Sequence, residues 1–335
     1  PVQFTVFPGG NFIAALLLIG CSLIALGQTA TTTPATTAMK AVADQVEADW
    51  TDGRWNRADV GPFMSAAIHT PRGRTLKGIA IKVGDAAQVT VCFNTELLGY
   101  SAAWADGFLE FDPRRYGLIG GPKPKGRTLF ANGTTPGWAH DGEWDDPRPR
   151  KRGPLPRGHA KYRGLYRHGN RVALSYSVGE TTVLESPWAG QAGDRLFLTR
   201  TFELGQAATP LTALIATKHG SKAVLKQIDG LAVAHLSDGD ESLWVVALGQ
   251  GASLEAENDR VLLTIQPGKS GRLAKVFLLQ APLSQAESIV ALAKANAAIE
   301  PPARLAKGGP GLWPPLATRG IVGKPLGAFA IDTIR

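Results

Sequence analysis

The sequence predicts a mainly β protein, built as an antiparallel β-sandwich with one or two peripheral helices. Turn-forming residues are plentiful, with 39 Gly and 23 Pro among 335 residues. From residue 59 onward, short apolar runs bounded by turn signals recur about every 8–12 residues, which is typical of sandwiches and barrels. The clearest ladder spans 161–186, where Val172, Leu174, Tyr176 and Val178 share one face.

Other segments of the chain show the same strand pattern. We expect strands at 77–83, 88–93, 102–111, 195–202, 211–217, 230–236, 243–248, 260–266 and 273–279. Asp106-Gly107 is a typical hairpin dipeptide, so the segment 102–111 is expected to fold back on itself. Helices are expected near 38–50 and 284–298, the second opened by a capping box of Ser284 and Glu287.

The N-terminal segment predicts export. The apolar run from Phe12 to Leu26 is shorter than the roughly 20 residues that span a bilayer, and it fits a signal peptide over 1–27. A lipid-modified Cys21 and a buried core helix are the alternatives. Residues 28–58 then form a Thr/Ala/Pro linker and a short helix. The β-sandwich domain is assigned to 59–300, and 301–335 to a linker and the start of a truncated downstream domain.

The two cysteines indicate no cofactor in this chain. Cys21 and Cys92 lie outside any C-x-x-C, C-x-x-C-H or Cys/His zinc pattern, so ligands for haem c or structural zinc are not expected. Cys92 sits in an apolar strand and is expected to be a buried, inert thiol.

Positive charge is concentrated in one stretch. The formal net charge is +8, and 114–171 holds 14 Lys and Arg against four acidic residues. Arg148, Arg150, Lys151 and Arg152 are therefore candidates for binding an anionic polysaccharide. The alternative is a solvated loop whose arginines pair with local acids. Nucleic acid is not an expected partner, because no nucleic-acid-binding motif accompanies the charge.

Aromatic and acidic residues supply further candidates. Four tryptophans near turns could stack on sugar rings if exposed, or could belong to the core: Trp104, Trp138, Trp144 and Trp188. Asp141, Glu143 and Asp145 are weak candidates for a Ca²⁺ loop, which the following arginines could instead neutralise. Glu185 with Glu110 or Asp112 could form the carboxylate pair of a glycosidase, although acids on strands are common without such a role.

Several runs carry a resemblance to a known family. They are GPFMSAAIH (61–69), KGIAIKVG, VCFNTELL, WADGFLEFD, GLIGGPKP and GPLPRGHAKYRGLYRHGNRVALSYSVGETTVLESPW (153–188). The chain resembles the uncharacterised N-terminal domain of large exported proteins of planctomycetes and their relatives, over roughly 59–335. In such proteins a propeller similar to sugar dehydrogenases and a c-type cytochrome follow. The resemblance implies a fragment whose haem would lie in the missing C-terminal part.

Together these expectations define a function class. We expect an exported accessory or binding module of the bacterial cell envelope, in the periplasm or outside the cell, with no transmembrane segment in the mature chain. It would be the N-terminal part of a cytochrome c-linked redox protein acting on carbohydrate-type substrates, with its own downstream domains as partners. The alternatives are a carbohydrate-active enzyme with acids on the sandwich face and a purely structural domain.

Overall fold

A computed structural model describes residues 54–57, 59–112 and 120–307. The chain divides into two units, Pro1–Ala48 and Asp49–Arg335, and every described residue belongs to the second. The expected signal peptide and the expected helix at 38–50 lie outside the described residues. In the part of the chain that is described, no helix has the length and apolar character needed to cross a membrane.

The described residues are mainly strand. The first half holds β1 (Phe63–Thr70), β2 (Gly73–Val83), β3 (Val89–Asn94), β4 (Gly99–Ala105), β5 (Leu109–Glu110), β6 (Lys123–Pro124), β7 (Arg127–Ala131), β8 (Ala160–His168) and β9 (Arg171–Val178). The second half holds β10 (Thr181–Ala192), β11 (Arg195–Leu204), β12 (Leu211–Thr217), β13 (Ala223–Ile228), β14 (Leu231–Asp238), β15 (Glu241–Leu248), β16 (Ala252–Glu257), β17 (Arg260–Ile265) and β18 (Arg272–Ala281). The helices are η1 (Arg54–Arg57), η2 (Leu283–Gln285), α2 (Ala286–Ala295) and η3 (Pro302–Lys307).

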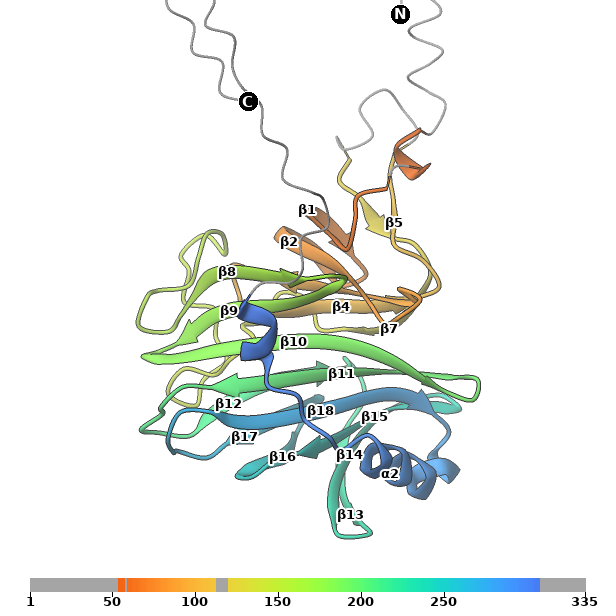
Figure 1. The fold of residues 1–335 in the computed structure, drawn as a ribbon, viewed down its shortest axis with the longest axis vertical. Helices are drawn as coiled ribbons and strands as arrows, with labels where there is room; N and C mark the ends of the chain where they lie inside the picture. The colour runs from red at the N-terminus through yellow and green to blue at the C-terminus, as the bar shows by residue number, and fades with distance from the viewer. Residues whose placement is uncertain (1–53, 58, 113–119, 308–335) are drawn as a thin grey trace, which may run out of the picture. The chain divides into compact units, whose positions relative to one another are not determined.

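These strands form two layers of antiparallel sheet. One layer is a single eight-stranded sheet in the order β13-β14-β15-β18-β11-β10-β9-β8. Figure 1 shows β8 to β11 side by side and continuing into β18 and β15. The other layer combines the sheets β1-β2-β3-β4-β7 and β12-β17-β16, while β5 and β6 form a small separate pair. The predicted fold class, a mainly β protein of antiparallel sheets with a short peripheral helix, is confirmed, and the sheets stay open.

Backbone and side-chain contacts join the two sheets of the second layer. Trp138 bridges to Ala213 in β12. Asn132, just after β7, donates to the carbonyl of Ile215 at 3.2 Å and accepts from the amide of Thr217 at 2.9 Å. Because both ends of this amide are paired with backbone groups of β12, the five- and three-stranded sheets act as one layer.

Alternation along the strands divides the apolar side chains among three clusters. In β18, Ala274, Val276 and Leu278 enter the large core between the layers, whereas Phe277 and Leu279 point to the opposite face. There α2 covers the eight-stranded sheet with Ile289, Val290 and Ala293. A third cluster, which includes Cys92 and Trp104, lies on the outer face of the five-stranded sheet under Leu109 and Phe111.

Most predicted elements are confirmed, and two details are wrong. The ladder 161–186 forms β8, β9 and the first half of β10. The segment 102–111 is not a hairpin: β4 pairs with β7 and β5 with β6, so Asp106 with its φ of 68° makes a corner instead. The C-terminal helix begins at Ala286, and no side chain caps it, so the proposed capping box does not form.

Candidate functional site

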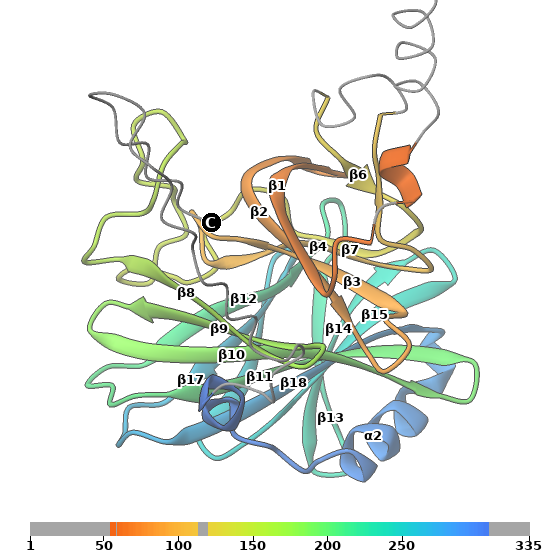
Figure 2. The ribbon, with the colours of Figure 1, turned by 45° about the horizontal axis from the view of Figure 1, so that its top comes forward.

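The outer face of the eight-stranded sheet is covered in two places. α2 lies over β14, β15 and β18, and residues 296–307, here called the strap, cross the other half. Figure 2 shows both covering elements in blue on the same sheet. A cavity of about 260 Å³ lies between the strap and the sheet. Its walls are Arg171, Ser186, Trp188, Thr199, Thr201, Lys275, Ala298, Glu300 and Leu305.

Strand alternation brings the polar side chains of this cavity together. On four neighbouring strands, β9, β10, β11 and β18, every second residue points away from the core. Arg171, Trp188, Thr199 and Lys275 occupy such positions, one on each strand. Their inward neighbours, such as Val172 and Val276, are fully buried. The site is therefore fixed on rigid sheet and not on loops.

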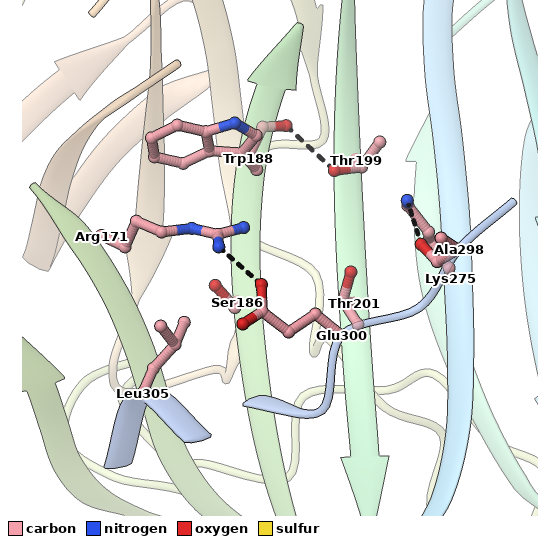
Figure 3. A pocket seen from close by; sticks show the side chains of 9 residues that line it. All are labelled: Arg171, Ser186, Trp188, Thr199, Thr201, Lys275, Ala298, Glu300 and Leu305. Carbon is pink, nitrogen blue, oxygen red and sulfur yellow. Dashed lines mark hydrogen bonds and ion pairs between the residues drawn. The ribbon is translucent and has the colours of Figure 1, made fainter. Parts of the chain in front are cut away.

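Arg171 lies at the centre of the cavity. Its Nη1 donates to Glu300 of the strap at 2.8 Å. Its guanidinium carbon lies 4.7 Å from the ring centroid of Trp188, a cation–π contact. Figure 3 shows Arg171 between the indole and the carboxylate. The buried Nε has no hydrogen-bond partner among the described residues. The Nε–H of Arg171 is therefore a donor without an acceptor in the part of the chain that is described.

Lys275 holds the first part of the strap. Its Nζ donates to the carbonyls of Asn296 at 2.8 Å and Ala298 at 2.9 Å. Burial, and secondarily the positive charge of Arg171, lowers the pKa of Lys275 below its usual range. The two cations therefore lie close enough to repel each other, and Glu300 is the single acid among the lining residues that opposes them.

The far end of the strap is fixed by packing and by one further acid. Pro302 and Leu305 are buried against the sheet. The amide of Ala303 donates to Glu203 of β11 at 2.8 Å. Residues 302–307, which the sequence places in a linker, thus form η3 on the sheet.

The lining chemistry suits binding better than hydrolysis. Thr199 donates to the carbonyl of Trp188 at 3.2 Å and Ser186 to that of Val172 at 3.0 Å, so both hydroxyl oxygens still have lone pairs to accept from a ligand. Glycoside hydrolysis uses two carboxyl groups about 5–10 Å apart. Among the lining residues only Glu300 carries one, and it is paired with Arg171.

The four candidate tryptophans have different surroundings. Trp104 and Trp138 are fully buried, so the exposure that sugar stacking requires is absent for both. Trp104 donates to the carbonyl of Phe108 at 2.6 Å. Trp144 is half-buried, with Arg260 5.7 Å from its ring centroid. Trp188 is half-buried too and is the one candidate tryptophan in the cavity wall.

The four basic candidates also differ in how far their side chains are exposed. Arg148 is only 5% exposed, which corrects the expectation of a solvated side chain. It binds both oxygens of Asp146 at 2.8 and 2.9 Å and Glu96 at 3.0 Å, beside a second cavity of about 350 Å³. Burial opposes ionisation of Asp146, but the hydrogen bonds from Arg148, followed by its charge, lower the pKa of that carboxyl below its usual range. Arg150, Lys151 and Arg152 are exposed.

Asp141, Glu143 and Asp145 do not converge on a metal position. The backbone groups of His140 and Glu143 pair at 2.9 and 3.0 Å, and Asp141 with φ 52° and Gly142 with φ 83° form the tight turn between them. The three acidic side chains are exposed. Across the residues that the structure describes, no group of three or more His, Cys, Asp or Glu could hold a metal ion.

Glu185 is part of a buried ion pair and cannot serve in a surface carboxylate pair. Arg200 of β11 donates to it at 2.7 Å, with both side chains at 0% exposure. Tyr176 donates to its other oxygen at 2.6 Å. Burial, followed by the charge of Glu185, raises the pKa of Tyr176 well above its usual range, so the phenol stays protonated.

Lys275 and Glu300 were not singled out from the sequence. Arg171 and Glu300 lie 129 positions apart, and no local pattern connects residues so distant. Lys275 did carry a signal, because it interrupts the apolar run of β18 on the face opposite to Ala274 and Val276.

Comparison with known proteins gives a partial family match and a distant structural likeness. None of the curated proteins is similar in sequence to this chain. A solved structure described as "Putative kojibiose phosphorylase from human microbiome" aligns at 12% identity with a TM-score of 0.33, covering 62% of this chain and 32% of that one. This chain therefore spans about a third of that protein's length. Residues 91–185, from β3 to β10, match the family model described as a domain of unknown function, DUF6797.

Proposed function

We propose that the domain is a non-catalytic carbohydrate-binding module and that the cavity beneath the strap holds the sugar. The observation that carries this proposal is the half-buried Trp188 in a polar, cation-containing cavity on rigid strands. An indole gives a sugar ring an apolar surface, while hydroxyls and cations of the wall pair with its hydroxyl groups. Thr199, Ser186 and Lys275 supply those groups.

Calorimetric titration with a panel of soluble neutral and acidic oligosaccharides tests this function. Trp188→Ala is expected to weaken binding about tenfold, because an aromatic contact contributes up to about 1.5 kcal/mol and 1.4 kcal/mol is tenfold in affinity. Trp144→Ala is the matched control, since that indole is also half-buried and also lies beneath an arginine.

The two variants also locate the site. Loss of affinity in Trp144→Ala with none in Trp188→Ala would move the sugar site to the loop near Arg260. A wild-type protein that binds no member of the panel at millimolar concentration would refute the function.

The exposed arm of Arg150, Lys151 and Arg152 supports a second, weaker activity toward anionic polysaccharide. Contacts of this kind are screened beyond about 8–10 Å at physiological salt, so retention on a heparin column should fall steeply between low and physiological salt. Replacing Arg150 and Arg152 with Ser should lower the eluting salt concentration, while leaving the buried Arg148 in place. Unchanged elution would exclude the arm as a binding surface.

The wider context stays a proposal that rests on the family resemblance of the sequence. In it, the module is exported to the bacterial cell envelope and serves as the N-terminal part of a larger redox protein, where it holds carbohydrate near the downstream domains. The coding sequence that follows residue 335 tests this context. A propeller and a C-x-x-C-H motif would support it, and an unrelated downstream sequence would remove it.

A further inference from the structure

The strap fills the cavity with acceptors from the protein's own chain. Glu300 sets a carboxylate against Arg171, and the carbonyls of Asn296 and Ala298 lie against Lys275. The two cations of the sheet therefore have a carboxylate and two neutral oxygens as partners, all supplied by residues 296–300. In Figure 3, Glu300 faces Arg171 and Ala298 lies beside Lys275.

That internal arrangement indicates which external groups the sheet can bind. A guanidinium has five N–H donors in a planar fork that matches a carboxylate. Glu300 engages Nη1 of Arg171, and Nε is buried without an acceptor in the described structure. A ligand carboxylate could meet Nη1 and Nη2 together, whereas Glu300 is bound through Nη1 alone.

We infer that the ligand is an acidic sugar, a hexuronate unit of a polysaccharide, for which Glu300 is a built-in competitor. The sugar carboxylate replaces Glu300 on Arg171, its hydroxyls replace the strap carbonyls on Lys275, and its ring lies against Trp188. This inference rests on the proposed function and names its substrate class.

The first half of the strap can move away from the sheet while its second half stays packed against the sheet. Glu300 keeps 48% of its side chain exposed, and Ala298 is exposed. The second half is held separately by the burial of Pro302 and Leu305 and by the bond from Ala303 to Glu203. An ion pair this exposed contributes little to stability, so a ligand carboxylate can displace it.

Titration of the full chain with trigalacturonate, and with the same oligosaccharide methyl-esterified, tests the inference. The ester keeps the ring and hydroxyls and removes only the charge. We expect the acid to bind at least about tenfold more tightly than the ester, since hydrogen bonds to charged groups are worth about 1.5–3 kcal/mol. Arg171→Gln should abolish this preference, so that the variant binds acid and ester equally.

Removing the carboxylate of Glu300 tests its role as a competitor more directly. Glu300→Gln should tighten trigalacturonate binding about two- to fivefold, the fold-change that matches an exposed ion pair of up to about 1 kcal/mol. Glu287→Gln, on the exposed face of α2, makes the same change in net charge outside the cavity and should leave affinity unchanged. A sulfated trisaccharide serves as a third ligand and should bind less tightly than trigalacturonate.

Each of the other outcomes would contradict one named part of the inference. Equal binding of acid and ester, with Trp188 still required, would leave the carbohydrate function standing and remove the acidic class. An equal gain in trigalacturonate affinity in Glu300→Gln and Glu287→Gln would show general charge attraction. Glu300 would then not be a competitor of the ligand carboxylate. Preference for the sulfated ligand would indicate general anion recognition in place of carboxylate recognition. If none of the three ligands bound, both the proposed carbohydrate function and this inference would be refuted.

Discussion

The eight-stranded sheet carries an arginine–carboxylate pair beside an aromatic ring on each of its faces. On the inner face, Arg200 and Glu185 are 2.7 Å apart and both 0% exposed, with the Tyr100 ring 4.6 Å from the guanidinium. On the outer face, Arg171 and Glu300 are 2.8 Å apart but 31% and 48% exposed, with the Trp188 ring at 4.7 Å. The local geometry is nearly the same, and burial is what differs.

Burial decides which pair can exchange partners. Arg200 also donates to the carbonyl of Leu214 at 3.1 Å, so it connects the eight-stranded sheet to β12 in the opposite layer. Removing one charge there leaves the other unpaired in a medium of low dielectric constant. The outer pair faces water, so solvent or a ligand can replace either partner at small cost. The inner pair is therefore structural, and the outer pair is suited to binding.

Disrupting the inner pair should have the largest effect. Arg200→Met is expected to lower the free energy of unfolding by about 3–5 kcal/mol, because Glu185 stays buried without its partner. Urea denaturation measures the loss. The double variant Arg200→Met/Glu185→Leu should recover part of it, since no lone charge stays buried, although the hydroxyl of Tyr176 loses its acceptor. A single variant within about 1 kcal/mol of wild type would contradict the assignment of the pair as structural.

Arg148 tests an intermediate case. Its side chain is 4% exposed and bonds to Asp146, Glu96 and the carbonyl of Gly153. Arg148→Ser should lower the free energy of unfolding by about 2–3 kcal/mol, since two carboxylates lose a charged donor. Arg152→Ser, on the exposed arm, should change it by no more than about 0.5 kcal/mol. Equal thermal melts for both variants would show that burial of Arg148 contributes nothing.

Two buried histidines predict loss of stability in acid, at a smaller scale. Burial lowers the pKa of His159 and of His235 below the ordinary value of 6.5. The unfolded chain therefore binds protons first as pH falls, and stability present above pH 6.5 is lost toward the lower folded pKa values. Each unit by which a histidine pKa is lowered corresponds to about 1.4 kcal/mol. We therefore expect the free energy of unfolding to fall between pH 7 and 5, measured by urea denaturation at each pH. A His235→Gln variant with an unchanged slope would argue against that histidine.

The outer pair should give the smallest change in stability. Arg171→Gln is expected to alter the free energy of unfolding by less than about 1 kcal/mol, the range of exposed ion pairs. Measured beside Arg200→Met under the same conditions, it isolates the effect of burial on one kind of contact. A loss as large as that of Arg200→Met would show that the strap is a fixed part of the fold.

Strands with strong alternation of apolar and polar residues were predictable from the sequence. The strands that were not predicted share one position in the fold, the edge of a sheet. Five strands were not named from the sequence, and all five lie at a sheet edge: β1, β6, β7, β13 and β16. β13, with the sequence AVLKQI, keeps one of six residues buried, and β16, ASLEAE, also one. An edge strand with one covered face needs few apolar residues, so its periodicity is weak.

The candidate site was predictable only in part. Trp188 and Arg171 were recognised as an aromatic candidate and as one of many basic residues, but their pairing with Glu300 depends on the path of the strap. The buried pair had a clearer signal: Arg200 and Glu185 stand at inward positions of neighbouring strands, between Leu198 and Phe202 and after Val183. Opposite charges at apolar positions of adjacent strands indicate an internal ion pair.

The reactivity of the Cys92 thiol can report local opening of the fold. The thiol is fully buried in β3, and burial raises its pKa to about 12. Thiolate is the species that reacts with alkylating and disulfide reagents, so labelling of Cys92 in native buffer requires Leu109 and Phe111 to move off the five-stranded sheet first. In a Cys21→Ser background, the labelling rate would therefore measure how often the segment that holds Leu109 and Phe111 opens, without denaturant.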